Sequence, residues 1–319
     1  MPTTFHLIIP GAALSQEPGS PPSSQAPKPV NLRVLLSAMV ATTRIDCADD
    51  SPAAPYELAL ALANGLPGEP GHIPWAAFET GSVGVPCAFI KLCHLQVGAD
   101  HILLSPPESL VVDLETSSVL MSAMAPYFLE DGITLRAYPA LQGTWFATGE
   151  PFRNLRTVST DRLAGRRLTR SMLESTGSSA NSSAALLRRL QNEMQMLLYT
   201  HPVNEARQQM RLLPVNSFWV TGAGVLDSKI PMSPTVRIEP RLHTAALRRD
   251  PAAHAQAWQT VDADTCADLL ARLRAGEEVL LTLCGNRAAQ TFERNKTGFF
   301  SRFKSLLGLQ PNQDVREQL

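Results

Sequence analysis

The chain has 319 residues, of which 44% are hydrophobic and 18% charged, so it carries enough apolar material for a sizeable core and too little charge for general disorder. Its 28 basic and 29 acidic residues give a net charge of -1, which argues against a nucleic-acid binder and against a protein held to an anionic membrane by charge. A chain of this length forms one large domain or two ordinary ones, and we expect one elaborated α/β domain over residues 1–319.

The start of the chain and its cysteines indicate where the protein works. The first ten residues carry no Lys or Arg, and their apolar stretch is too short for a signal sequence or a transmembrane segment. The cysteines are odd in number, five in all, and form no Cys-x-x-Cys pair, which favours reduced thiols over disulfides or a zinc site. We therefore expect a cytoplasmic protein with no transmembrane segment.

The first elements along the chain are short. Residues 5–9 form an apolar run that Pro10-Gly11 stops, which predicts a buried strand. Residues 15–29 are dominated by Pro, Ser, Gly and Gln and predict a mobile surface loop. Helices are expected over residues 31–40 and 55–63, since each begins with a residue that favours a helix N-terminus.

The second half of the chain has the clearest patterns. Residues 184–200 place their leucines on one helical face, and residues 279–284 are continuously apolar, as in a strand buried on both faces. The polar run 175–183 predicts a flexible loop or an internal boundary. Residues 217–220 predict a strand that ends in a turn at 221–224. The other expected elements are strands at 85–92 and 101–104, a hairpin of 132–138 with 144–147, and a helix at 264–275.

Strands that are buried on both faces need helices on both sides of the sheet. The expected fold class is therefore α/β, with a mixed, mostly parallel central sheet and helices on both faces. In folds of this class, ligands bind beyond the carboxyl ends of the strands.

Three stretches of sequence resemble known families. Residues 201–224, HPVNEARQQMRLLPVNSFWVTGAG, and residues 93–101, CHLQVGADH, resemble a bacterial family named regulators of pathogenicity factors, type E, which genomes often label as phosphoglycerate mutases. The first stretch also looks like a segment of archaeal-type cofactor-independent phosphoglycerate mutases. Residues 29–36, PVNLRVLL, are similar to a helix start in the alkaline-phosphatase superfamily. The resemblance implies a reduced alkaline-phosphatase-like fold and a regulatory role.

The departures from the mutase pattern concern the metal site. In the mutases the first strand ends in Asp-Gly, whose carboxylate holds a divalent metal, whereas Pro10-Gly11 stands at the equivalent end here. No Asp-His pair of the metal type follows the last strand at Cys284-Gly285-Asn286. Two-metal phosphoryl transfer needs several carboxylates and imidazoles around the ions, so we expect no metal cofactor and a protein that is non-catalytic or only weakly catalytic.

The block 201–224 is the candidate ligand site. Arginine forks match phosphate and carboxylate geometry, and glycines let the main chain approach an anion closely. The pattern therefore predicts a site for a small phosphorylated or carboxylated metabolite. The alternative is that the asparagines cap local turns and that the arginines are solvated. The candidate ligand-binding residues are His201, Asn204, Arg207, Arg211, Asn216, Gly222 and Gly224.

A second cluster is formed by His94, Asp100 and His101. These residues are the candidates for catalysis, and together with Asp113 they are the alternative ligands for manganese or zinc. On that hypothesis the chain is a working metal-dependent phosphoglycerate mutase or phosphatase. Their spacing matches no standard metal motif, and structural histidines in a turn at the end of a sheet explain the pattern better than metal ligands do.

The third hypothesis is an interaction protein. Residues 298–308 predict a basic amphipathic helix that docks onto a partner, lies on a membrane surface, or packs on the chain's own core. The apolar face of this helix consists of Phe299, Phe300, Phe303, Leu306 and Leu307.

Overall fold

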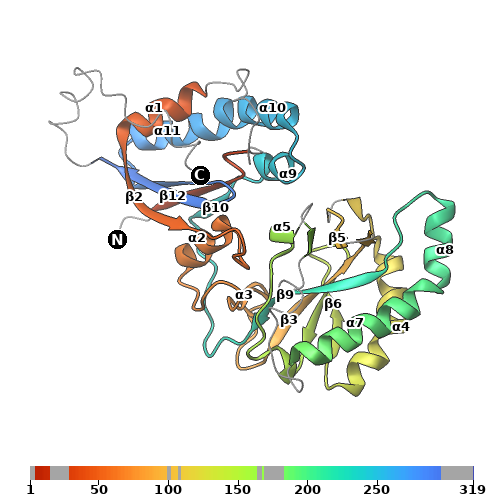
Figure 1. Ribbon diagram of the computed structural model, residues 1–319. Coiled ribbons are helices and arrows are strands. Elements are labelled where there is room, and N and C mark those ends of the chain that lie inside the picture. Colours follow the sequence, from red (N-terminus) through yellow and green to blue (C-terminus); the bar gives the residue numbers. More distant parts are fainter. Residues whose placement is uncertain are drawn as a thin grey trace. The chain divides into compact units, whose positions relative to one another are not determined.

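The computed structural model describes residues 4–14, 29–98, 102–106, 109–163, 167–168, 183–295 and 319 (Figure 1). Its internal contacts divide the chain into two compact units. Unit 1 consists of Met1–Asp49, Ala54–Asn64 and Ser233–Leu319, and unit 2 consists of Asp50–Ala53 and Gly65–Met232. Each unit has its own sheet and its own buried clusters. The expectation that the chain folds as one elaborated domain stays a prediction.

Unit 1 is built on a five-stranded mixed sheet. Its three neighbours β10, β1 and β11 are parallel, whereas β12 pairs antiparallel with both β11 and β2. In sheet order the strands are β10 (Val236–Ile238), β1 (Phe5–Pro10), β11 (Val279–Cys284), β12 (Ala288–Arg294) and β2 (Met39–Asp46).

Helices cover both faces of this sheet, as Figure 1 shows. Leu7 and Ile9 of β1 point into a cluster with α1 (Val30–Ala38) and α11 (Ala267–Arg274), while Ile8 points into a cluster with α2 (Pro55–Asn64) on the other face. Every β1 residue from Leu7 onward is buried, so this part of the strand is continuously apolar rather than alternating. The remaining helices of unit 1 are α9 (Arg241–Leu247), α10 (Pro251–Val261) and the π-helical turn η3 (Asp262–Cys266).

Unit 2 has an antiparallel four-stranded sheet. In sheet order it contains β6 (Thr134–Ala137), β7 (Thr144–Thr148), β3 (Cys87–Cys93) and β9 (Ser217–Gly224), and a smaller sheet contains β4 (Leu95–Val97), β5 (Ile102–Leu104) and β8 (Arg167–Leu168). The helical elements are α3 (Trp75–Thr80), α4 (Leu114–Glu130), η2 (Glu150–Phe152), α5 (Thr160–Leu163), α7 (Ser183–Tyr199) and α8 (Pro202–Gln209).

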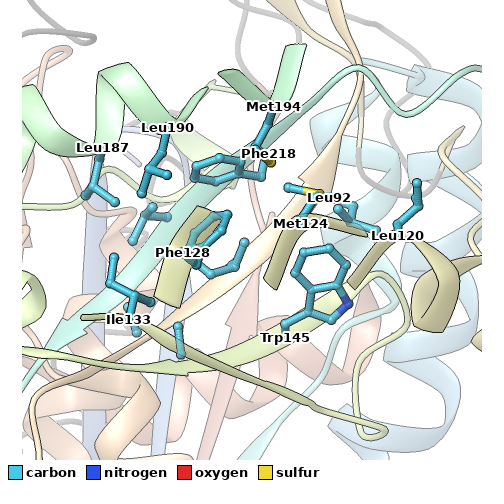
Figure 2. Close-up of a cluster of buried hydrophobic side chains, with 14 of the residues drawn as sticks. Leu92, Leu120, Met124, Phe128, Ile133, Trp145, Leu187, Leu190, Met194 and Phe218 are labelled. Carbon is cyan, nitrogen blue, oxygen red and sulfur yellow. The ribbon is translucent and has the colours of Figure 1, made fainter. Parts of the chain in front are cut away.

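The largest buried cluster of unit 2 lies between the four-stranded sheet and helices α4 and α7 (Figure 2). Phe128 of α4 and Phe218 of β9 lie side by side, with ring centroids 5.2 Å apart. The indole nitrogen of Trp145, another fully buried side chain, donates to Ser117 Oγ at 2.9 Å. The cluster thus buries large aromatic groups and satisfies the polar atom that one of them brings with it.

The α/β class, with a mixed sheet and helices on both faces, is confirmed. The sheet of unit 1 is not mostly parallel, because β12 follows β11 through a short turn and forms a hairpin with it. The helices expected at 55–63 and 184–200 and the strand at 279–284 are confirmed by α2, α7 and β11. Among the described residues, no helix combines the length and the apolar character needed to cross a bilayer.

Other expected elements differ or lie outside the described residues. Strand β9 continues through Gly224 instead of turning at 221, and α11 is preceded by η3 where a single helix was expected. The predicted loops at 15–29 and 175–183 lie outside the described residues except at their last positions. The predicted helix at 298–308 lies wholly outside them.

Candidate functional site

The block 201–224 begins as a capped helix. His201 is the N-cap of α8, and its Nδ1 accepts a hydrogen bond from the main-chain N–H of Val203 at 3.2 Å. Pro202 occupies the first turn, where a missing N–H costs nothing. His201 also lines an open surface hollow of about 590 Å³, formed with Tyr127, Glu193, Met196, Leu197, Thr200 and Pro202.

Both asparagines of the block bind the main chain. Buried Asn204 donates through Nδ2 to the carbonyl oxygens of Leu198 and Val215, at 2.8 and 2.7 Å, and its Oδ1 accepts from the Val215 N–H at 2.9 Å. Asn216 exchanges a similar pair with Leu95, whose N–H donates at 2.7 Å and whose carbonyl accepts at 2.8 Å. These amides hold the start of β9 to α7 and to β4.

The two arginines of the block differ. Arg207 is 3% exposed, and its Nε donates to the carbonyl oxygen of Leu213 at 2.8 Å. Its Nη2 is buried and has no hydrogen-bond partner among the described residues. Burial lowers the pKa of Arg207, and the nearby charge of Asp113 opposes that shift. Arg211, in contrast, is exposed and adopts a left-handed backbone with φ of 58° just after α8.

The two glycines of the block lie against α3. A Cβ added to Gly222 would be 2.8 Å from Trp75 Cβ, and one added to Gly224 would be 2.8 Å from Pro74 Cβ. Gly222 also has a left-handed φ of 62°. Both positions therefore need glycine for close packing inside unit 2, and their role in approaching an anion stays a prediction.

The second cluster is only partly described, because Asp100 and His101 lie outside the described residues. His94 Nδ1 lies 2.8 Å from the carbonyl oxygen of Pro214, to which it donates. Asp113 is the N-cap of α4, where it accepts from the Thr116 N–H at 2.7 Å, and this bond is the main reason that the pKa of Asp113 is lowered. Both residues are thus hydrogen-bonded to the main chain.

The carboxyl ends of β1 and β11 lie side by side, with Pro10 in register with Cys284. Gly11 has a left-handed φ of 70°, and its carbonyl oxygen accepts from His254 Nε2 at 2.7 Å. Beyond β11, Gly285 and Asn286 begin the turn to β12. Within the described part of the chain, no three or more His, Cys, Asp or Glu side chains form a group able to hold a metal ion. The described residues at these strand ends do not fit a two-metal centre.

The N-terminus of α1, in the segment similar to the alkaline-phosphatase superfamily, binds a carboxylate of the chain itself. Asp262 accepts through Oδ2 from the Asn31 N–H at 3.1 Å and through Oδ1 from the Leu32 N–H at 2.8 Å. The Asn31 side chain donates to the main-chain oxygen of Asp262 at 2.9 Å. Helix N-termini attract anions, and an internal anion fills this one. No local sequence signal pairs Asn31 with a residue so far along the chain.

The cysteines do not form a reactive site. All five lie in the described part of the chain, all are buried, and no disulfide joins them. Burial raises the pKa of Cys87 to about 11 and those of Cys93 and Cys266 to about 12, and it raises the pKa of Cys284 as well. Thiols of this kind are almost wholly protonated at neutral pH, so they are poor nucleophiles and poor metal ligands.

Comparison with known proteins gives only distant structural similarities. No family model matches the chain, and no curated protein matches it. A cofactor-independent phosphoglycerate mutase from Thermoplasma acidophilum DSM 1728 is 13% identical, with 93% of this chain and 90% of that chain covered and a TM-score of 0.34. The PH0037 protein from Pyrococcus horikoshii is 11% identical, with coverages of 92% and 88% and a TM-score of 0.40. At such values these likenesses assign no residue a role, and membership of the type E regulators stays a prediction.

Proposed function

We propose that this chain is a cytoplasmic regulatory protein that binds a small phosphorylated or carboxylated metabolite beside Arg207, and that phosphoryl transfer is not its activity. The observation that supports this most is the buried Nη2 of Arg207, which has no partner among the described residues. A buried donor without an acceptor is costly. A phosphate or carboxylate oxygen would satisfy it through a charge-assisted hydrogen bond.

The contacts of Arg207 show which hydrogen bonds a ligand would add to its guanidinium. The Nε position is already bound to Leu213, and Asp113 supplies a negative charge that acts on the guanidinium while its own carboxylate caps α4. Nη2, which carries two N–H groups, therefore remains for an oxygen of the ligand. The other predicted ligand residues, His201, Asn204, Arg211, Asn216, Gly222 and Gly224, would form the frame around this donor.

The alternative of a manganese or zinc enzyme has no described observation in its favour. His94 and Asp113 already serve the main chain, and the carboxyl ends of β1 and β11 offer no ionised ligand among the described residues. The alternative of an interaction scaffold depends on Phe299, Phe300, Phe303, Leu306 and Leu307, which lie outside the described residues, and it also stays a prediction.

Thermal unfolding with and without ligand tests the proposal. We expect 3-phosphoglycerate, used as the probe at well above its dissociation constant, to stabilise the wild-type chain by about 2–3 kcal/mol, because a ligand that binds only the folded state stabilises by mass action. Glycerol, which has no anionic group, should have no such effect. Arg207→Met removes the donor and keeps most of the apolar stem, so the response to 3-phosphoglycerate should disappear.

Arg136→Met is the matched control, since Arg136 of β6 carries the same charge in the same unit but is exposed and is not one of the predicted ligand residues. It should keep the wild-type response. The site would be wrong if Arg207→Met, shown to be folded by circular dichroism, responded as the wild type does, or if both variants lost the response equally. The second result would mean that the anion acts through general charge.

A further inference from the structure

The turn that joins β11 to β12 presents two main-chain donors to one oxygen. The turn is closed by a hydrogen bond from the Gly285 N–H to the Ala288 carbonyl oxygen at 2.9 Å. The N–H groups of Arg287 and Ala288 both donate to the main-chain oxygen of Leu319, at 2.9 and 3.0 Å. Successive main-chain N–H groups that converge in this way form a small concave site for an anionic or carbonyl oxygen.

Gly285 lets Leu319 approach this turn. A Cβ added at position 285 would be 2.5 Å from the carbonyl carbon of Leu319 and 2.7 Å from its Cβ, and Leu319 supplies all of the nearest atoms. The backbone of Gly285 is not among those with a left-handed φ. Glycine is therefore needed here for close approach of another main chain, and not for the turn itself.

The side chain of Leu319 completes the contact. It is 7% exposed and belongs to the buried cluster that also contains Ile9, Leu283 and Ala288. One residue thus places an isobutyl group into the core of unit 1 and an oxygen onto two amides beside it. The contact lies at the carboxyl ends of β1 and β11, where α/β sheets bind their ligands.

We propose that the 285–288 turn and the adjoining apolar cluster form a recognition site for a leucine-type acid, by which we mean an acylated leucine with an accessible main-chain oxygen. Leu319 of the same chain occupies this site and competes with such ligands. The two amides select the oxygen, and the cluster selects a branched aliphatic side chain. A phosphate ester has no apolar group for the cluster. The site belongs to unit 1 and is independent of Arg207, so either proposal can fail without the other.

Because Leu319 occupies the site, it should weaken the binding of an external ligand in solution. A residue tethered to its own site competes at a high effective concentration, typically millimolar. The wild-type chain should therefore bind an external leucine-type acid only weakly, and a chain whose residue 319 cannot enter the cluster should bind it more tightly. Leu319→Asp is such a change, because a carboxylate is not accepted into an apolar cluster without a partner.

Calorimetric titration of the full 319-residue chain with N-acetyl-L-leucine tests this. We expect Leu319→Asp to bind this probe at least tenfold more tightly than the wild type does. N-acetylglycine, which has the same acyl and carboxylate groups but no side chain, should bind weakly to both. Adding Gly285→Ala to Leu319→Asp should weaken binding of N-acetyl-L-leucine at least tenfold, since the new Cβ fills the space of the oxygen. Gly276→Ala is the control for a new Cβ away from the site, since its nearest neighbour is Arg294 at 3.8 Å. Its φ of 88° strains an alanine, so it should lower stability but leave the affinity for N-acetyl-L-leucine unchanged.

The proposal fails if Leu319→Asp binds N-acetyl-L-leucine no more tightly than the wild type, if N-acetylglycine binds equally well, or if Gly285→Ala has no effect. If Leu319→Asp does not fold, Leu319→Ala is the second variant, because it removes most of the side chain that occupies the cluster. It should also bind N-acetyl-L-leucine more tightly than the wild type does. Equal affinities would overturn the proposal.

Discussion

Replacing Asn204 by alanine should weaken unit 2 whether or not a ligand is present. The Asn204 amide makes three hydrogen bonds of 2.7 to 2.9 Å to the main chain of Leu198 and Val215, and the side chain is 5% exposed. Asn204→Ala removes all three and leaves the N–H of Val215 without this acceptor. Since each buried hydrogen bond contributes about 1 kcal/mol net and an abandoned buried group costs about 1–3 kcal/mol, we expect a loss of about 3 kcal/mol in the free energy of unfolding.

Urea unfolding followed by tryptophan fluorescence measures this loss. Trp145 and Trp219 are buried in unit 2 and should report its unfolding. With a urea dependence of about 2–3 kcal/mol per molar for a unit of this size, the midpoint should fall by about 1 M. The matched control is Gln208→Ala, an exposed position on the same helix, which should shift the free energy by less than about 0.5 kcal/mol.

Two results would refute this reasoning. A loss below about 0.5 kcal/mol for Asn204→Ala would show that the three hydrogen bonds contribute little. A loss that appears only with 3-phosphoglycerate would show that Asn204 acts on the ligand and not on the fold. An equal loss with and without ligand would identify Asn204 as the residue that holds β9 to α7.

Three further predictions concern other parts of the chain. Gly222→Ala should lower the free energy of unfolding by about 2–4 kcal/mol in thermal unfolding, because the new Cβ lies 2.8 Å from Trp75 Cβ and φ is 62°. Gly84→Ala is its control: φ is 71° but nothing lies within 4 Å, so the loss should be only about 1 kcal/mol. Burial lowers the pKa of His6 from 6.5 to about 4. Between these two pH values His6 is protonated in the unfolded chain but neutral in the folded chain, so the free energy of unfolding should fall as the pH drops from 6.5 to 4, by at most about 3 kcal/mol. His6→Gln should remove that part of the slope in unfolding curves measured at each pH. Asp262→Ala should cost about 2 kcal/mol in thermal unfolding, since it removes the acceptor of two N–H groups at the start of α1.

The sequence predicted best those elements in which burial alone determines where the apolar residues lie. In α7, Leu187, Leu190, Met194 and Leu198 are all buried and all lie on one face, so the helical period was visible in the sequence. In β11, a continuous apolar run matches a strand buried on both sides. Helix α4 escaped prediction because it carries Pro126, and because Leu114, Val119 and Leu129 are exposed, which obscures the face that Leu120, Met124 and Phe128 bury.

The candidate site was predictable as a list of polar residues but not as a set of contacts. Nothing near Gly222 in sequence indicates that Trp75 lies against it, and nothing near Asn216 indicates that its amide pairs with Leu95. Both facts depend on strand and helix pairings that join distant parts of the chain. The contact between Gly285 and Leu319 is of the same kind, because only the folded main chain shows why residue 285 has no side chain.

The division of unit 1 into three separate stretches of sequence affects how the protein is made. Strand β1 leaves the ribosome early, but its neighbours β10 and β11 are synthesised only after all of unit 2. During synthesis β1 therefore remains an unpaired apolar strand while unit 2 is made and folds. In that time it can pair with the edge of another sheet. Asn64 and Ser233, the two points where the insertion leaves and returns, are joined by a hydrogen bond of 3.0 Å from the Ser233 N–H to Asn64 Oδ1. A gene that replaces residues 65–232 by a short spacer between Asn64 and Ser233 would bring β10 and β11 soon after β1 in the chain. Unit 1 could then be produced without unit 2.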